Sequence, residues 1–160
     1  MAYKGKYKPK NINKYKGNPT NVIYRSLWER QVMITLDKDP RILQWNAEGV
    51  IIPYISPIDG KAHRYFVDFW VMKEMTEGKS EEFLIEVKPM KQTAPPNPKN
   101  KNNTPTGRLS RRYLNETKTF GINMAKWKAA DAFAAKRNMK FIVLTEKGVT
   151  ERWRNFYEIL

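Results

Sequence analysis

The sequence predicts an α/β domain in which a helix precedes a run of short strands, and a second helix precedes a last strand. Three observations support this fold class: two segments repeat hydrophobic residues at helical spacing, short β-branched and aromatic runs bounded by turn residues separate them, and no internal repeat is present. With 160 residues, 41% of them hydrophobic, the chain is large enough for one core and too short for two comfortable ones. We expect one domain over residues 20–160, preceded by a separate segment over residues 1–19.

The first segment is basic, because the first acidic residue of the chain is Glu29. Its lysines are interleaved with Tyr3, Tyr7 and Tyr15, so that rings and charges can follow a nucleic-acid backbone. We expect a flexible arm in the free protein. Two interpretations of the arm stay open, a solvated tail and a segment that binds DNA through Lys4, Lys6, Lys8 and Lys10.

The first helix is expected to begin at Thr20 or Asn21, either of which can cap it, and to end between Asp37 and Pro40. Short runs with strand composition follow, and a turn at Asp59-Gly60 precedes the third of them. The predicted strands are residues 42–45, 50–55, 64–72 and 83–88.

The next segment, residues 89–107, contains five prolines among Asn, Lys and Thr and has almost nothing to bury, which predicts a long mobile loop. A second helix is predicted over residues 108–137, either continuous or broken at Gly121. A strand over residues 140–145 follows. The spacing of Trp153, Phe156 and Tyr157 predicts a short helix over residues 150–160 whose aromatic side chains either pack on the core, which we favour, or form a partner surface.

Composition restricts the partners and the chemistry. Thirty Lys and Arg against sixteen Asp and Glu give a net charge of +14, which favours nucleic acid, and less so an anionic membrane, as the partner. No apolar run approaches the length of a membrane span, and the first residues are too polar for a secretory signal, so we expect a soluble protein that is not exported. The chain has no cysteine and one histidine, so any metal must be held by oxygen, as magnesium or manganese are.

The strongest chemical pattern is Glu86-Val87-Lys88 at the end of a predicted strand. Side chains alternate along a strand, so Glu86 and Lys88 share one face while the hydrophobic residues between them face the other way. For phosphodiester hydrolysis, Glu86 can hold a divalent cation and Lys88 can steady the attacking water or the charge on the phosphate oxygens. The alternative is an ordinary salt bridge on an exposed strand.

Asp68 lies in the middle of an aromatic and aliphatic strand, where an unpaired carboxylate would be costly to desolvate. A hairpin with a loop from Lys73 to Glu81 would place it beside Glu86, so that the two acids share a cation. The alternative is a side-chain partner such as Arg64 or Lys88. Glu29 is a third candidate acid: on the first helix it either points toward the sheet or pairs with Arg25 one turn earlier.

Basic residues suggest a DNA-facing surface beside these acids, because no acidic residue interrupts the chain from Val87 to Asn115. His63 is a weak candidate for a phosphate contact and Arg64 a better one. A solvated charged face is the alternative for the set on the second helix. The members of that set are Arg108, Arg111, Arg112, Lys118 and Lys126.

The order of elements resembles the restriction-endonuclease-like core of the PD-(D/E)XK nucleases. It runs from a helix with Glu29 through a strand with Asp68 and a strand with Glu86-Val87-Lys88 to a further helix and a strand. More specifically, segments 24–30, 63–69 and 85–89 resemble the head completion nucleases of T-even-type tailed phages, as do residues 1–7 and 52–60. A similar arrangement occurs in the transposon-end (TnsA-like) endonuclease family. Val67 stands where the proline of the motif is expected, a change in a backbone position that leaves the chemistry intact.

The resemblance implies a fold and an activity. The fold is a helix, a mixed sheet of four to five strands, a helix and a strand, with an additional C-terminal helix. The activity is that of a Mg²⁺-dependent DNA endonuclease, with Mn²⁺ as a substitute, in which Lys88 is the catalytic lysine and Glu29 joins the acids. The metal ligands implied are Asp68, Glu86 and the backbone carbonyl of Val87.

The resemblance also implies a biological setting. The protein would finish filled phage capsids in the host cytoplasm, perform its cut beside portal or neck proteins, and have its place at the virion head or neck. The alternative is a non-catalytic structural protein of the head or neck that binds DNA on a retained nuclease scaffold.

Overall fold

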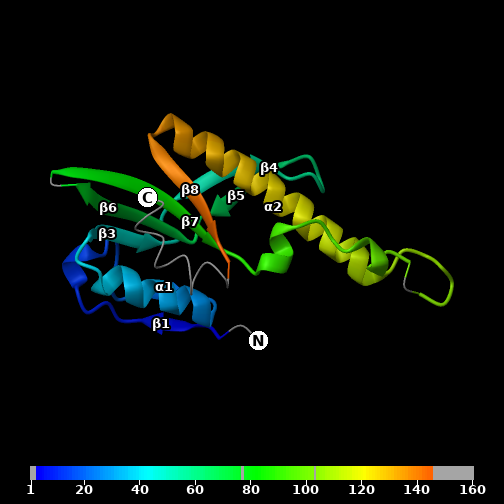
Figure 1. The fold of residues 1–160 in the computed structure, drawn as a ribbon, viewed down its shortest axis with the longest axis horizontal. Coiled ribbons are helices and arrows are strands. Elements are labelled where there is room, and N and C mark those ends of the chain that lie inside the picture. Colours follow the sequence, from blue (N-terminus) through cyan, green and yellow to red (C-terminus); the bar gives the residue numbers. More distant parts are fainter. Residues whose placement is uncertain (1–2, 77, 103, 146–160) are drawn as a thin grey trace.

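The computed structural model describes residues 3–76, 78–102 and 104–145. Its centre is a four-stranded sheet, in which β8 is parallel to β7 and the other neighbours are antiparallel (Figure 1). One helix covers each face of this sheet: α1 (Leu27–Lys38) one and α2 (Arg111–Lys136) the other. The restriction-endonuclease-like α/β fold predicted from the sequence is confirmed. The strands in sheet order are β3 (Ile42–Ala47), β6 (Phe69–Thr76), β7 (Lys79–Val87) and β8 (Met139–Leu144).

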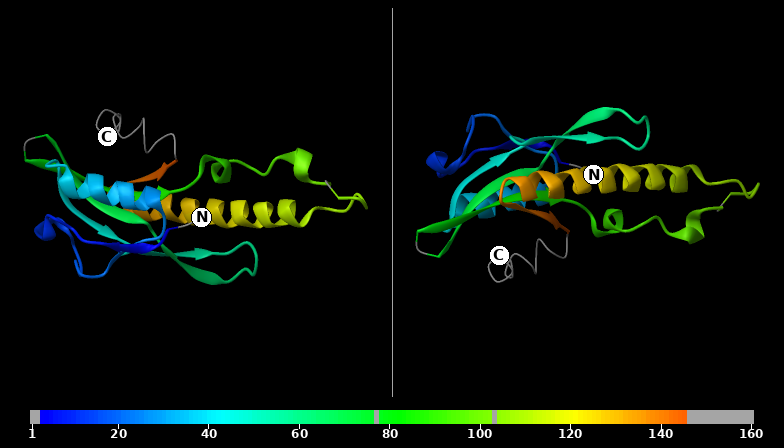
Figure 2. Two further views of the ribbon diagram at one scale, coloured as in Figure 1. Left: turned by 90° about the horizontal axis from the view of Figure 1, so that it is seen from below. Right: turned by 90° about the horizontal axis from the view of Figure 1, so that it is seen from above.

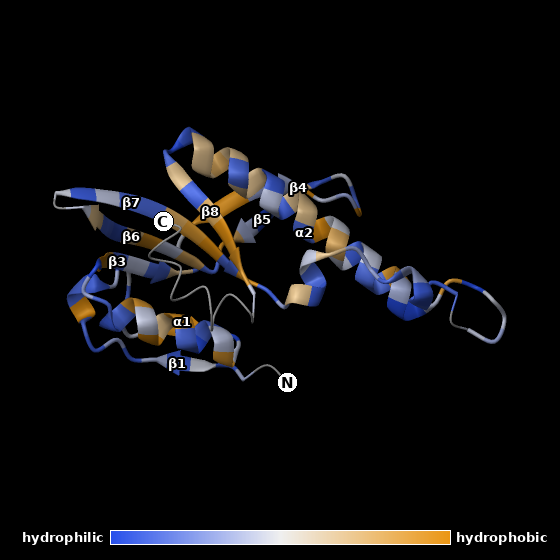
Figure 3. Cartoon of the chain, viewed as in Figure 1, coloured by the Kyte–Doolittle hydropathy of each residue, from blue (hydrophilic) through white to orange (hydrophobic). Residues whose placement is uncertain are grey.

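Alternation along β7 divides the core into two halves. Phe83 and Ile85 pack with the α1 side, whereas Leu84 packs with Trp127 of α2. All three strand residues are fully buried, and each contributes about 1.5–3 kcal/mol of hydrophobic stabilisation. The two helices are therefore fixed to opposite faces by consecutive residues of one strand, and Figure 3 shows the hydrophobic ends of β7 and β8 between them.

The predicted strand over residues 64–72 is wrong as a single element, because the chain changes sheets in its middle. β5 (Ala62–Phe66) pairs with β4 (Ile51–Ile55) in a separate two-stranded sheet, and β6 begins only at Phe69. Two backbone hydrogen bonds hold the crossing: Val67 N–H donates to the Val50 carbonyl, and Glu48 N–H donates to the Asp68 carbonyl, both at 3.1 Å. Asp68 thus lies at the joint between the two sheets.

The first helix begins later than predicted. Residues Val22–Tyr24 form strand β2, which pairs with β1 (Gly5–Tyr7), and the N-cap of α1 is Ser26 instead of Thr20 or Asn21. The Ser26 hydroxyl accepts a hydrogen bond from Glu29 N–H at 3.1 Å. Pairing with β1 and burial of Val22 outweigh the helical periodicity in this segment.

The segment predicted as a flexible arm is packed on the domain in the structure. Tyr7 from β1 donates its hydroxyl hydrogen to the fully buried Asp37 at 2.8 Å, and Tyr15 packs edge-on against Trp45 with ring centres 4.8 Å apart. The lysines Lys4, Lys6, Lys8 and Lys10 alternate with these inward positions and are all exposed. Tyr7 and Tyr15 therefore pack against the core, which composition alone does not reveal.

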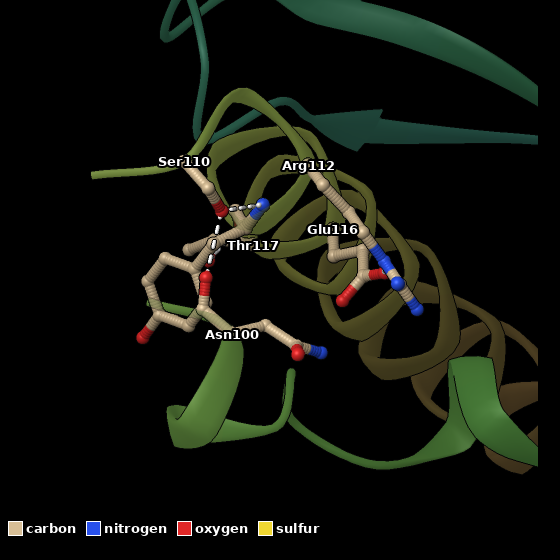
Figure 4. Close-up of polar contacts among 6 residues, drawn as sticks. Asn100, Ser110, Arg112, Glu116 and Thr117 are labelled. Carbon is tan, nitrogen blue, oxygen red and sulfur yellow. Dashed lines mark hydrogen bonds and ion pairs between the residues drawn. The ribbon is translucent and has the colours of Figure 1, made fainter. Parts of the chain in front are cut away.

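Helix α2 is continuous through Gly121, so the alternative with a break there is wrong. Its first half projects beyond the sheet, with the Pro-rich segment running beside it (Figure 2). That segment contains two short 3-10 helices, η2 (Met90–Thr93) and η3 (Pro98–Asn100). Ser110 fastens it to the helix: its hydroxyl donates to the Asn100 carbonyl at 2.7 Å and accepts from Tyr113 N–H at 3.0 Å (Figure 4).

The short helix predicted over residues 150–160, with its three aromatic residues, lies outside the described residues. Within the described part of the chain, neither helix combines the length and the apolar character that crossing a membrane requires.

Candidate active site

The paired ends of β6 and β7 bring Asp68 next to Glu86. The strands form the predicted hairpin, although its turn is shorter than expected, since β6 ends at Thr76 and β7 starts at Lys79. Phe69 pairs with Ile85 in this antiparallel ladder. Asp68, which precedes Phe69, and Glu86, which follows Ile85, are therefore neighbours at the end of the ladder. The register of this hairpin therefore places the two carboxylates side by side.

Glu86 is a buried carboxylate with two partners. The Tyr65 hydroxyl donates a hydrogen bond to Glu86 Oε2 at 2.6 Å, and Lys88 Nζ lies 3.5 Å from Oε1. Only 5% of Glu86 is exposed, which excludes the interpretation of Glu86 and Lys88 as a salt bridge on an exposed strand. Tyr65 comes from β5, so the separate two-stranded sheet contributes directly to the site.

Asp68 is held by the backbone of the neighbouring strand. Its Oδ2 accepts a hydrogen bond from Val87 N–H at 2.8 Å. Burial raises the pKa of Asp68 well above its usual value, and the negative charge of Glu86 raises it further, while the Val87 N–H opposes the shift. Glu29 adds a smaller effect in the same direction as Glu86, so three acids act on one another.

Glu29 lies within electrostatic range of Asp68 and Glu86, and its side chain forms no ion pair with the Arg25 side chain. Arg25 instead makes an ion pair with Glu48 at 2.6 Å and donates its backbone N–H to Glu29 Oε2 at 2.9 Å. Burial raises the pKa of Glu29, and the charges of Glu48 and Glu86 add to the shift. The ion pair with the Arg25 side chain is therefore absent, and the carboxylate of Glu29 interacts electrostatically with the acid pair.

The acid pair has the chemistry of an oxygen-ligand metal site. A divalent cation shared by the two carboxylates would stabilise their ionised forms, because its positive charge opposes the burial and the negative charge of Glu86 that raise the pKa of Asp68. Within residues 3–76, 78–102 and 104–145, no cluster of three or more acidic or histidine side chains is close enough to form a metal site by itself. The residues present therefore fit an ion held by two carboxylates together with backbone oxygen or water, as magnesium commonly is.

Of the candidate DNA-binding residues, Lys126 interacts electrostatically with Asp68 and Glu86. Its ammonium is 5.4 Å from the centre of the Tyr65 ring, and the charges of Lys88, Glu86 and Asp68 all act on it. The other candidates on α2 and just before it, Arg108, Arg111, Arg112 and Lys118, are exposed, and Arg112 makes an ion pair with Glu116 at 2.8 Å (Figure 4).

Two further candidates, His63 and Arg64, lie on β5, the strand that also carries Tyr65. His63 makes an ion-pair contact with Asp59 at 2.8 Å across the turn, and Arg64 lies over the Phe66 ring at 5.5 Å. Arg64 is exposed and is not the partner of Asp68 that the sequence left open. Sequence reasoning missed Tyr65 and Glu48, because their roles arise from contacts between elements that are distant in the chain.

Comparison with known proteins agrees with this geometry. Residues 39–146 match the family described as TnsA-like endonuclease N terminal. The "Head completion nuclease" of Enterobacteria phage T4 is 45% identical over 149 residues, which cover 93% of this chain and 95% of that protein. No solved structure matches the chain. The family match covers Asp68, Glu86 and Lys88 together with the strands β6 and β7. It confirms the resemblance seen in the sequence: the chain belongs to the TnsA-like endonuclease family.

Proposed function

We propose that this protein is a metal-dependent endodeoxyribonuclease that hydrolyses phosphodiester bonds at the Asp68–Glu86 pair. The observation that supports this function best is the combination of two neighbouring carboxylates with Lys88 Nζ 3.5 Å from Glu86 at the end of one hairpin. A purely structural DNA-binding protein has no need for two neighbouring acids, one of which, Asp68, has its pKa raised by burial and by the charge of the other. A nuclease does, because they hold a cation where the phosphate must bind.

Each residue has a distinct task in the proposed reaction. Asp68 and Glu86, with the backbone carbonyl of Val87, would hold Mg²⁺, and Mn²⁺ would substitute because it takes the same oxygen ligands. The bound cation supplies positive charge against the negative charge that develops on the phosphate. The Lys88 ammonium orients the attacking water or stabilises that charge, and Tyr65 fixes the orientation of Glu86 through its hydrogen bond.

Glu29 and the surface lysines complete the proposal. Glu29 adds a third carboxylate on the α1 side, where it would orient water or a ligand of the cation. The exposed lysines Lys4, Lys6, Lys8 and Lys10 would bind phosphates of the duplex away from the cut, as would Arg64 and the basic residues of α2. The net charge of +14 supports this broad electrostatic contact.

The biological role we propose follows from the printed name of the phage relative. The protein would act in head completion, trimming DNA after packaging beside portal or neck proteins. Its place would be the host cytoplasm during assembly and then the virion head or neck. The coverage of 93% of this chain and 95% of that relative supports a shared role, since neither protein has a large region that the other lacks.

The test is cleavage of supercoiled and linear DNA in Mg²⁺ or Mn²⁺ by the wild type, Lys88→Ala and Asp68→Asn. We expect the two variants to lose cleavage by about 100-fold or more, because each removes a group that acts on the reacting phosphate. Lys38→Ala and Asp131→Asn, both at exposed helix positions, are matched controls and should cleave like the wild type. Equal cleavage by all variants would reveal a contaminant, and DNA binding without any cleavage would favour the non-catalytic head or neck protein.

A further inference from the structure

Lys126 lies over two tyrosine rings, one from β4 and one from β5. It projects from α2, and its Nζ lies 5.4 Å from the ring centre of Tyr65 and 5.8 Å from that of Tyr54. Tyr65 is the residue whose hydroxyl donates to Glu86 at 2.6 Å. The lysine, the tyrosine and the carboxylate therefore form one continuous set of contacts from α2 through β5 to β7.

The ammonium of Lys126 has donors that the protein does not use. The side chain is half-buried, yet among the described residues it makes ring contacts and no hydrogen bond or ion pair. A charged group in this position costs free energy unless an anion compensates it. The burial that lowers the pKa of Lys126 is reinforced by Lys88 and opposed by Glu86 and Asp68, so all four groups lie within electrostatic range of one another.

Charge balance indicates what the ammonium binds. Two carboxylates and a divalent cation are together neutral, which leaves the positive charges of Lys88 and Lys126 beside them. Glu29, whose pKa is raised by burial, offsets at most one of these charges. A site of this composition attracts a phosphate.

We propose that Lys126 is a second active-site lysine, which binds a non-bridging oxygen of the phosphate that is cut. This inference rests on the proposed nuclease function and deepens it. Lys88 acts from the strand that carries Glu86, whereas Lys126 acts from the helix on the α2 face of the sheet. The phosphate would be contacted by cationic groups from two elements, which fixes its orientation better than one flexible side chain can.

The decisive variant is Lys126→Met, which keeps an unbranched apolar stem against the two tyrosine rings and removes the charge. The matched control is Lys128→Met, two residues further along the same helix and exposed. Two quantities are measured on a short duplex: the single-turnover cleavage rate in Mg²⁺, and the dependence of DNA affinity on salt in EDTA. Thermal melting of each variant checks that the fold is kept.

We expect Lys126→Met to cleave about 100-fold more slowly and to reduce the slope of log affinity against log salt by about 1. Lys128→Met should keep the wild-type cleavage rate. Wild-type cleavage and an unchanged slope in Lys126→Met would overturn the proposal, as would slower cleavage with an unchanged slope, which would make Lys126 a support for Tyr65. If the wild type does not cleave at all, the nuclease function fails, and the salt slope still decides whether Lys126 binds phosphate.

Discussion

Two carboxylates, Asp37 and Asp68, lie in opposite environments of this molecule. Asp37 has no exposed surface and accepts hydrogen bonds from the Tyr7 hydroxyl and from the backbone N–H groups of Lys10 and Asn11, at 2.8, 2.7 and 3.1 Å. Asp68 is less buried and accepts one backbone hydrogen bond beside another acid. Burial alone therefore does not distinguish a functional carboxylate. The balance between hydrogen-bond donors and neighbouring negative charges does.

The difference reflects two uses of the same chemical group. Asp37 joins the N-terminal segment to the end of α1, because it gathers donors that would otherwise lack a partner. Burial and the neighbouring Glu86 make the ionised form of Asp68 costly, and a bound cation would offset that cost. Three substitutions test this contrast.

The largest expected effect on stability comes from Asp37→Ala. Removing this acceptor leaves two backbone N–H groups and the Tyr7 hydroxyl without their partner, so we expect the free energy of unfolding to fall by about 3 kcal/mol. Denaturant unfolding measures the loss, and hydrogen exchange should show deprotection of β1. A variant as stable as the wild type would mean that the N-terminal segment does not depend on Asp37.

For Asp68→Asn in the absence of divalent cations, we expect the free energy of unfolding to rise instead of fall. Folding raises the pKa of Asp68, so the protonated form favours the folded state, and stability is lost as the pH rises above about 4 through the raised pKa. Asparagine can still accept the Val87 hydrogen bond and carries no charge. We therefore expect Asp68→Asn to be more stable at pH 7 by on the order of 1 kcal/mol, with a weaker dependence on pH.

Unfolding curves at several pH values in EDTA measure this difference, and Asp131→Asn on the exposed surface of α2 is the control. Equal stability of Asp68→Asn and the wild type at pH 7 would show that the acid pair is not under electrostatic stress.

The smallest effect is expected for Tyr7→Phe. This change removes one of the donors to Asp37 and keeps the ring against Trp45, so we expect a loss of about 0.5–1 kcal/mol. The hydroxyl has its pKa raised by burial and by the hydrogen bond to Asp37, which indicates that the bond forms with the neutral tyrosine. Thermal unfolding checks the loss, and Tyr3→Phe at an exposed position should be neutral.

Much of the fold was predictable where local pattern and tertiary structure agree. The strands β3, β4, β7 and β8 and the helix α2 lie close to their predicted ranges, because strand alternation and helical periodicity there reflect packing on the sheet. The structure departs from the predictions in the N-terminal segment up to residue 26 and in residues 64–72. In the first region, hydrophobic residues pair with another segment of the chain, and in the second the chain changes from one sheet to the other. A local pattern has no information about either event.

The sequence alone determined the identities of the acids and the lysine. Asp68 is conspicuous inside an apolar stretch, and Glu86 and Lys88 are two residues apart on a strand, so physical chemistry restricts what they can do before any fold is known. Only the tertiary structure decided that Tyr65 donates a hydrogen bond to Glu86, that Lys126 lies over the Tyr65 ring, and that Tyr7 and Tyr15 of the basic segment pack against the core. These contacts link residues on different elements, and their distances depend on how helices and sheets pack, which no spacing along the chain records.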